Sequence, residues 1–282
     1  MATLGYHPAT WGGRLDGLWQ GLPFMSRCGW DGFEYCYDDL GDCAAGPSWY
    51  ERPDEFQQKL DEYQMTLSAL YISSGYRDAD EVAEHRARVT AGADFCAELG
   101  ARRSPPPFIL LDGGARQDSG QYSDADFIRV ADAANRCGEI CRAKGLQCSW
   151  HQHWGTMFEF EEQFTRLMEM TDPELVLCTP DTAQLSLGDF DVVETVRRYR
   201  DRIRYIHFKD LDTNRRFIEL GRGTVDFVGA WQALGAEAYD GWVVVDLDYT
   251  SLDADESCRV NKAYLNDVLG IRGKRDRVAR SA

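Results

Sequence analysis

Eight short apolar runs recur along the chain at intervals of roughly thirty to forty residues, and an amphipathic, charge-rich stretch follows each of them. Their length and their content of valine, isoleucine, leucine and aromatic residues are typical of strands buried on both faces. Two intervening stretches, 78–100 and 123–145, have helical apolar spacing and close on glycine, and the second opens on a serine–aspartate cap signature. The runs are TLGYHP (3–8), GFEYCY (32–37), MTLSALYI (65–72), PFILLDGG (107–114), LQCSWHQH (146–153), ELVLCTPD (174–181), RYIHFKD (204–210) and GWVVVDLD (241–248).

Strand candidates that alternate with helix candidates in this way predict an α/β protein built as a single (β/α)8 TIM barrel. A doubly wound open sheet is the main competitor, but it would normally show a glycine-rich phosphate turn, and GYHPATWGG does not have that pattern. No low-complexity linker or break in composition divides the chain, so we expect one domain over residues 1–282. The basic end, 273–282, is expected to be a mobile, solvated tail, with a small anion-binding tail as the alternative.

The net charge of −16 argues against nucleic acid and anionic membranes as primary partners, because such a surface repels phosphate. The same charge does not oppose a neutral polyol or a divalent cation. No apolar stretch approaches about 18 residues, so no membrane-spanning helix is expected, and the start of the chain lacks the pattern of a signal peptide. The nine cysteines form no Cys-x-x-Cys pair and often lie in apolar runs. They are predicted to be reduced, buried thiols of a cytoplasmic protein.

Polar residues of the kinds that bind ligands stand at the ends of nearly all the predicted strands. In a barrel of this class the active site lies at the C-terminal ends of the strands, so these side chains are expected to meet at one mouth. They are His7, Glu34, Asp112, His151, His153, Asp181, His207, Lys209, Asp246 and Asp248.

His151 and His153 have the same parity on a strand and should face the same side. Either both face the site, or one serves the site while the other hydrogen-bonds a neighbouring loop. His207 lies in an apolar run, where a lone histidine is usually a satisfied core residue. Lys209 shares its parity, and a core would reject an unpaired ammonium group, which favours a functional reading for both.

The carboxylates add a reason to expect a cation. Asp181 either caps the following helix or contributes to a shared site. Asp246 and Asp248 face the same way and repel each other unless a positive charge lies near them. Histidine and carboxylate ligands without cysteine suit Mn²⁺, Co²⁺, Zn²⁺ or Fe²⁺. Aromatic residues near strand ends, Trp11, Trp154 and Tyr249, either stack on a sugar or cyclitol ring or serve in packing.

Several of these segments together resemble the xylose-isomerase-like superfamily of sugar isomerases, epimerases and keto-polyol dehydratases, which is built on a (β/α)8 barrel. The resemblance is strongest to its inosose-dehydratase-like branch and extends over roughly residues 145–250; the N-terminal half matches in rhythm only. The segments are HQHWGT, MFEFEE with Glu159, CTPDTAQLSLGDFD, RIRYIHFKD, FIELGRGTVDF and GWVVVDLD.

The resemblance implies a metal site of the family's Glu, Asp, His and Glu ligands on the last strands. His151 stands at the first Glu position, Asp181 and His207 match, and Asp246 stands at the last Glu position. An aspartate reaches about 1.5 Å less far than a glutamate, so the metal shifts, a water intervenes, or Glu159 or Asp248 completes the ligand set.

The chemistry that the resemblance implies is removal of a proton from the carbon beside a carbonyl, in an isomerase or epimerase acting on a keto-sugar or cyclitol. An inosose-type dehydratase is the alternative. Mn²⁺ or Co²⁺ is the preferred metal, with Zn²⁺ or Fe²⁺ as alternatives. Asp246 or His153 is expected to act as base and Lys209 to bind or protonate an oxygen. The expected substrate-binding residues are His7, Glu34, Trp154 and Glu159.

Two further classes remain open from the sequence. A DNA-repair barrel of the endonuclease IV type shares the superfamily fold, but it needs a basic DNA-binding face, which the net charge of −16 opposes. A barrel that binds a ligand without catalysis is kept open by the two altered ligand positions. The sequence does not specify the substrate, and homo-oligomers are common among such barrels.

Overall fold

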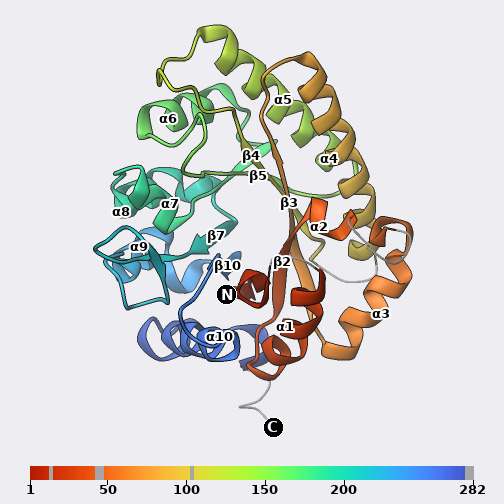
Figure 1. Ribbon diagram of the computed structural model, residues 1–282, viewed down its shortest axis with the longest axis vertical. Helices are drawn as coiled ribbons and strands as arrows, with labels where there is room; N and C mark the ends of the chain where they lie inside the picture. Colours follow the sequence, from red (N-terminus) through yellow and green to blue (C-terminus); the bar gives the residue numbers. More distant parts are fainter. Residues whose placement is uncertain (13–14, 42–47, 102–104, 277–282) are drawn as a thin grey trace.

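Eight parallel strands form the centre of the molecule and helices surround them, as the computed structural model shows (Figure 1). The structure describes residues 1–12, 15–41, 48–101 and 105–276. Around the barrel the strands follow the order β6-β5-β4-β3-β2-β1-β10-β7. The predicted (β/α)8 TIM barrel is therefore confirmed.

The strands of the barrel coincide with the eight apolar runs of the sequence. Only β3 extends beyond its predicted run, because Ser73 and Ser74 still pair with Asp112 and Gly113 of the next strand. The barrel strands are β1 (Thr3–Tyr6), β2 (Gly32–Cys36), β3 (Thr66–Ser74), β4 (Phe108–Gly113), β5 (Cys148–His151), β6 (Val176–Thr179), β7 (Tyr205–Phe208) and β10 (Trp242–Val245). A small antiparallel pair, β8 (Asp210–Leu211) and β9 (Phe217–Ile218), follows β7 and was not predicted.

Helices connect the strands, and their starts follow ordinary capping rules. The side chain of Asp78 accepts hydrogen bonds from two backbone amides at the start of α4, and Ser123 forms a capping box with Asp126 at the start of α5. The α-helices are α1 (Leu15–Arg27), α2 (Tyr37–Gly41), α3 (Pro53–Tyr63), α4 (Ala79–Gly100), α5 (Asp124–Ala143), α6 (Glu161–Met170), α7 (Thr182–Leu187), α8 (Val192–Tyr199), α9 (Phe227–Leu234) and α10 (Ala254–Ala263). Shorter helical turns are η1 (Pro8–Trp11), η2 (Trp49–Glu51), η3 (Arg200–Arg202), η4 (Ala236–Ala238) and η5 (Tyr264–Val268).

The barrel closes between β6 and β7. Within the described residues, an isolated bridge between Asp181 and His207 joins these strands, with the His207 amide donating to the Pro180 carbonyl at 3.0 Å. The other neighbouring strands pair over two to six residues each. The seam between β6 and β7 is thus the most sparsely bonded part of the barrel.

An apolar layer fills the barrel interior below the C-terminal ends of the strands, and we call it the lower layer. Its members come from strands on opposite sides of the barrel, and the rings of Phe108 and Tyr205 lie 5.3 Å apart. Glycine is required beside Trp242, because a Cβ on Gly32 would lie 2.8 Å from the Trp242 ring and 2.4 Å from the Thr66 carbonyl oxygen. The layer consists of Ala69, Phe108, Leu110, Tyr205, Trp242 and Val244. Alternation along a strand then places the next inward-facing residues above this layer, toward the C-terminal ends.

The C-terminal segment lies against the start of the barrel. The Asp31 carboxylate accepts hydrogen bonds from the backbone amides of Leu4, Lys274 and Arg275, each at 2.9 Å. The Arg275 guanidinium reaches the Trp30 carbonyl at 3.3 Å. Residues 273–276 of the predicted tail therefore have defined contacts, whereas 277–282 lie outside the described residues.

Two smaller expectations concern helices and cysteines. Among the helices of the described ranges, none combines the length and the apolar character that a bilayer span requires. The eight cysteines in the same ranges are free thiols, and six of them are buried.

Candidate metal centre at the mouth of the barrel

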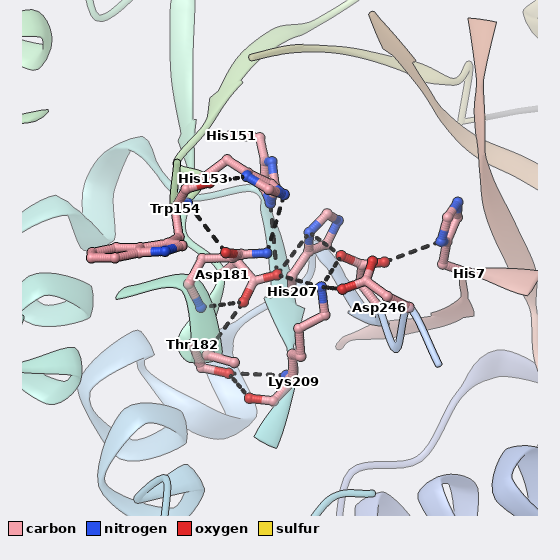
Figure 2. Close-up of polar contacts among 12 residues, drawn as sticks. His7, His151, His153, Trp154, Asp181, Thr182, His207, Lys209 and Asp246 are labelled. Carbon is pink, nitrogen blue, oxygen red and sulfur yellow. Dashed lines mark hydrogen bonds and ion pairs between the residues drawn. The ribbon is translucent and has the colours of Figure 1, made fainter. Parts of the chain in front are cut away.

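Four side chains from the ends of four strands meet at the C-terminal mouth of the barrel (Figure 2). His151 ends β5, Asp181 follows β6, His207 lies in β7 and Asp246 follows β10. All four are buried, and one donor atom of each lies within 4.8 Å of the others. The structure thus brings together the four residues to which the resemblance assigns a metal.

Asp181 has a different task for each carboxylate oxygen. Its Oδ1 accepts hydrogen bonds from the amides of Ala183 and Gln184, each at 2.9 Å, and so caps α7. Its Oδ2 is left to face the cluster, 3.7 Å from His151 Nε2 and 3.7 Å from His207 Nδ1. Asp181 therefore caps α7, as one sequence interpretation expected, and its second oxygen also lies where the shared-site interpretation requires it.

His207 is oriented by Glu34 of β2, on the other side of the barrel. The Glu34 carboxylate lies 2.7 Å from His207 Nε2, which directs Nδ1 toward Asp181 and Asp246. Burial lowers the pKa of His207, but Glu34, Asp181 and Asp246 outweigh burial and raise that pKa to about 10. A carboxylate that fixes one ring nitrogen of a histidine is the usual partner of a metal-binding imidazole.

The donor atoms fit a divalent cation. His151 Nε2, Asp181 Oδ2 and His207 Nδ1 are buried and have no hydrogen-bond partner among the described residues. Asp181 Oδ2 lies 3.7 Å from each of the two ring nitrogens, and His207 Nδ1 lies 3.6 Å from Asp246 Oδ2. These distances are close to the roughly 3.5 Å that separates ligands arranged tetrahedrally around Zn²⁺. Buried polar atoms without partners are costly, and a bound cation would satisfy all of them together.

Lys209 supplies a positive charge beside the same carboxylates. Its Nζ lies 2.9 Å from Asp246 Oδ2, 2.9 Å from Asp248 Oδ2 and 3.6 Å from Asp181 Oδ2. Burial alone would lower the pKa of Lys209, but these carboxylates hold it well above its ordinary value. Burial would likewise raise the pKa of Asp181 and of Asp246, and Lys209 with the nearby histidines holds both well below their usual range. Lys209, Asp181 and Asp246 are therefore charged.

His7, at the end of β1, flanks the cluster through Asp246. Its Nδ1 lies 3.1 Å from Asp246 Oδ1, on the side of that carboxylate away from Lys209. Burial lowers the pKa of His7, but Asp246 and Cys36 outweigh burial and hold it well above the ordinary value. His7 thus contacts a member of the cluster and is not itself one of the four donors.

His153 lies beside the cluster, its ring 5.6 Å from that of His151. The Trp154 amide donates to Gln184 Oε1, which directs the Gln184 amide nitrogen toward His153 Nε2 at 3.2 Å. The His153 Nδ1–H then donates to the Trp154 carbonyl at 2.6 Å. His153 therefore has its proton on Nδ1 and its lone pair on Nε2.

Trp154 and Glu159, both expected to bind substrate, belong to the loop after β5. The indole of Trp154 points away from the four donors in Figure 2 and packs near Leu187 and Leu211. Glu159 is buried, pairs with Arg116 at 2.8 Å and accepts a hydrogen bond from the Gly155 amide at 3.1 Å. Glu159 and Asp248 lie outside the four-residue group that could hold a metal.

Two aromatic groups show the limits of the sequence reasoning about the mouth. Tyr71 of β3 was missed, although it stands near the end of its apolar run as the other candidates do. Its ring lies edge-on to His151 at 5.7 Å, and its hydroxyl donates to the Asp112 carboxylate. Burial and Asp112 together raise the pKa of Tyr71 well above its usual value. Trp11, by contrast, packs against Tyr6 and donates to Asp255 at 2.9 Å.

The closed parallel barrel with histidines and carboxylates at its C-terminal mouth defines an α/β barrel with a polar site where such barrels carry their chemistry. The chain belongs to the family described as xylose isomerase-like TIM barrel, which it matches over residues 22–266. The resemblance inferred from the sequence motifs is thereby confirmed.

Individual relatives and solved structures are similar to this chain. An inosose dehydratase of Lacticaseibacillus casei is 27% identical over 278 residues, covering 89% of this chain and 90% of the relative. Among solved structures, the IolI protein with a bound zinc atom aligns at a TM-score of 0.77 with 16% identity, covering 95% of this chain and 98% of its own. L-Ribulose 3-epimerase aligns at a TM-score of 0.74 with 16% identity, covering 100% and 98%. At such identities the solved structures support the fold alone.

Proposed function

We propose that the protein is a divalent-metal-dependent enzyme that removes a proton from the carbon beside a carbonyl group in a keto-cyclitol or keto-sugar. The observation that carries the proposal is the convergence of His151, Asp181, His207 and Asp246 with donor atoms within 4.8 Å of one another. Three of those atoms have no hydrogen-bond partner within the part of the chain that the structure describes, which supports the proposal further. Mn²⁺ or Co²⁺ is the preferred ion, and Zn²⁺ or Fe²⁺ suits the same donor types.

When bound, such an ion polarises a carbonyl oxygen and so acidifies the neighbouring carbon. The chain must then supply a base. Asp246 and His153 are the candidates, since Asp246 is ionised and His153 has its lone pair on Nε2. Each has a contact to give up: the His153 lone pair accepts a hydrogen bond from Gln184 at 3.2 Å, and the Asp246 oxygens lie 2.9 Å from Lys209 Nζ and 3.1 Å from His7 Nδ1. Glu34 orients His207, and His7 orients Asp246.

Dehydration is the outcome that the comparisons favour. In that reaction the base takes the proton beside the carbonyl, the C–O bond of the next hydroxyl breaks, a carbon–carbon double bond forms, and the hydroxide leaves as water with a second proton. Lys209 is the group that we assign to donate that second proton. A relative that covers 89% of the chain is an inosose dehydratase, whereas the likeness to L-ribulose 3-epimerase comes from a structure at 16% identity.

Isomerisation or epimerisation is the second candidate, because the same proton abstraction followed by return of the proton to another carbon or face gives those products. The mouth that would bind the substrate is formed in part by His153 and Trp154, which are half-buried and so remain accessible. We keep Trp154, Glu159, His7 and Glu34 as proposed contacts of the substrate or of the groups that bind it.

The test combines metal loading with product analysis. Purified protein loaded with Mn²⁺, Co²⁺, Zn²⁺ or Fe²⁺ is incubated in ²H₂O with a panel of keto-inositols and ketohexoses, and products are followed by mass spectrometry and NMR. Loss of water supports the dehydratase, and deuterium incorporation at unchanged composition supports the isomerase or epimerase. The matched control is His151→Ala. Bound metal without exchange or turnover of any substrate would contradict the enzyme and favour a ligand-binding barrel.

A further inference from the structure

The ammonium of Lys209 lies among the atoms that would bind the metal. It is 2.9 Å from Asp246 Oδ2 and 3.6 Å from Asp181 Oδ2, the same two oxygens that face His207 Nδ1. Figure 2 shows it reaching them from the side opposite His151. Lys209 is almost wholly buried, at 1% exposure, so water cannot screen this contact. Two carboxylates of the cluster thus already have a cation.

A divalent ion and this ammonium cannot share those oxygens comfortably. An ion bonded to Asp246 Oδ2 at about 2.1 Å would lie within about 5 Å of Nζ in its present position. A double and a single positive charge at that separation repel strongly in a buried site. Metal binding therefore favours any position of the ammonium that is farther from Asp181 and Asp246.

In its present position the ammonium already has two favourable contacts outside the four-residue group. Asp248 Oδ2 lies 2.9 Å from Nζ, its side chain is 43% exposed, and it lies outside the four-residue group. The ring of Phe217 adds a second favourable contact, with its centroid 4.5 Å from Nζ. The lysine backbone is held in place, because Thr182 Oγ1 bonds both the Lys209 amide at 3.0 Å and its carbonyl at 2.7 Å. Only the side chain needs to move.

We propose that Lys209 is an internal cation that exchanges with the metal: its ammonium neutralises Asp181 and Asp246 in the metal-free protein, and when a divalent ion binds it gives up these two contacts and keeps those with Asp248 and the face of Phe217. The inference rests on the metal dependence proposed above. It makes Asp248 a positioning residue that tunes metal affinity without being a ligand. It also explains how a cluster of buried carboxylates remains stable before the metal arrives.

The experiment is calorimetric titration of the metal-free full chain with Mn²⁺ and with Zn²⁺. Lys209→Met removes the competing charge at similar length, and we expect it to bind the ions at least about tenfold more tightly. Asp248→Asn removes the alternative partner, and we expect about three- to tenfold weaker binding. In the double variant the effect of Asp248→Asn should disappear, because no ammonium remains to be placed. Lys59→Met, which removes an exposed lysine from α3, controls for net charge.

Circular dichroism establishes that each variant is folded. If Lys209→Met does not fold, Asp248→Asn alone decides. The internal-cation proposal predicts that Asp248→Asn binds the metal more weakly, whereas a merely structural role of Lys209 predicts unchanged metal affinity. Unchanged affinity in Lys209→Met and in Asp248→Asn, with metal bound by the wild type, would overturn the exchange and leave the proposed function intact. Binding only to Lys209→Met would support the exchange and overturn metal dependence of the wild type. Failure of all variants to bind would overturn both.

Discussion

The lower and upper parts of the barrel interior are formed by the same strands but hold opposite kinds of side chain. On β7, Tyr205 of the apolar layer is followed two residues later by His207, and on β10 Trp242 and Val244 are followed by Asp246. The lower layer consists of six buried hydrophobic residues, whereas the upper layer concentrates histidines, carboxylates and a lysine. Packing of the apolar layer therefore holds the strands together, while the last inward-facing residues of the same strands supply the charged groups of the site.

The largest effect is expected from the apolar layer. Trp242→Ala should lower the free energy of unfolding by about 4 kcal/mol, because it removes a large side chain that is 3% exposed and leaves a cavity between β10 and β2. Urea denaturation followed by circular dichroism measures the change. The comparison between the layers would fail if Trp242→Ala were no more destabilising than Tyr249→Ala, a half-exposed aromatic on the same segment.

A buried histidine outside the barrel sharpens the comparison with the charged layer. His85 of α4 is 1% exposed and hydrogen-bonds the Tyr76 hydroxyl at 2.7 Å. Burial, with a smaller effect of Arg88, lowers its pKa to about 4, whereas carboxylates raise that of His207. Because the unfolded chain binds the proton first, His85 should cost stability progressively as the pH falls from about 6.5 to about 4.

The expected loss is about 3 kcal/mol across that window, constant below it and absent above it. Unfolding free energies at pH 7 and pH 4.5 measure it, with His85→Gln as the matched variant that keeps a hydrogen-bonding group for Tyr76. Carboxylates titrate in both proteins and cancel in the difference. An equal pH dependence of the wild type and His85→Gln would show that burial does not hold this ring neutral.

The two tasks of Asp181 can be separated by substitution. Asp181→Asn keeps an oxygen to cap α7 but replaces the oxygen that faces the cluster, so we expect about hundredfold weaker binding of Mn²⁺ and a change in unfolding free energy below about 1 kcal/mol. Asp181→Ala should lose both the metal and the cap. Metal binding retained in Asp181→Asn would remove this residue from the ligand set.

The smallest effect is expected from Glu34. Glu34→Gln can still accept a hydrogen bond from His207 Nε2 but removes the negative charge 2.7 Å away, and we expect about tenfold weaker binding of Mn²⁺. Chelator competition provides the readout. If Glu34 contacted only substrate, as the sequence suggested, its substitution would leave metal affinity unchanged.

Much of the fold could be predicted because strands buried on both faces appear in the sequence as continuous apolar runs. The eight runs marked the eight strands, and the sequence showed the cap of one long helix at Ser123. The small pair β8–β9 was missed, because two-residue strands, one in KDLD and one in FIELGRG, have no periodicity to detect. The carboxylate of Asp210 in β8 also accepts hydrogen bonds from the amides of Gly221 and Gly223, at 2.9 and 2.8 Å, and so binds the loop that follows β9.

The site was less predictable than the fold. Parity and strand ends brought His151, His207 and Lys209 to one mouth, because those rules are local. The partnership of Glu34 with His207 spans 173 residues and depends on the diameter of the closed barrel, which no local pattern records. Tyr71 was missed because its uncharged phenol lies within an apolar run, where an aromatic residue usually belongs to the core.

The sparse seam between β6 and β7 has a consequence for mechanical stability. Asp181 and His207, the residues whose backbones make the bridge, also carry two of the four donor side chains. An ion held between them would cross-link β6 and β7 at the most sparsely bonded seam of the barrel. Amide hydrogen exchange at this seam should therefore slow when the ion is added. Removing the ion would then allow β6 and β7 to separate locally at the ends that carry the donor side chains. Loss of the metal would thus cause both the loss of activity and the local opening of the barrel.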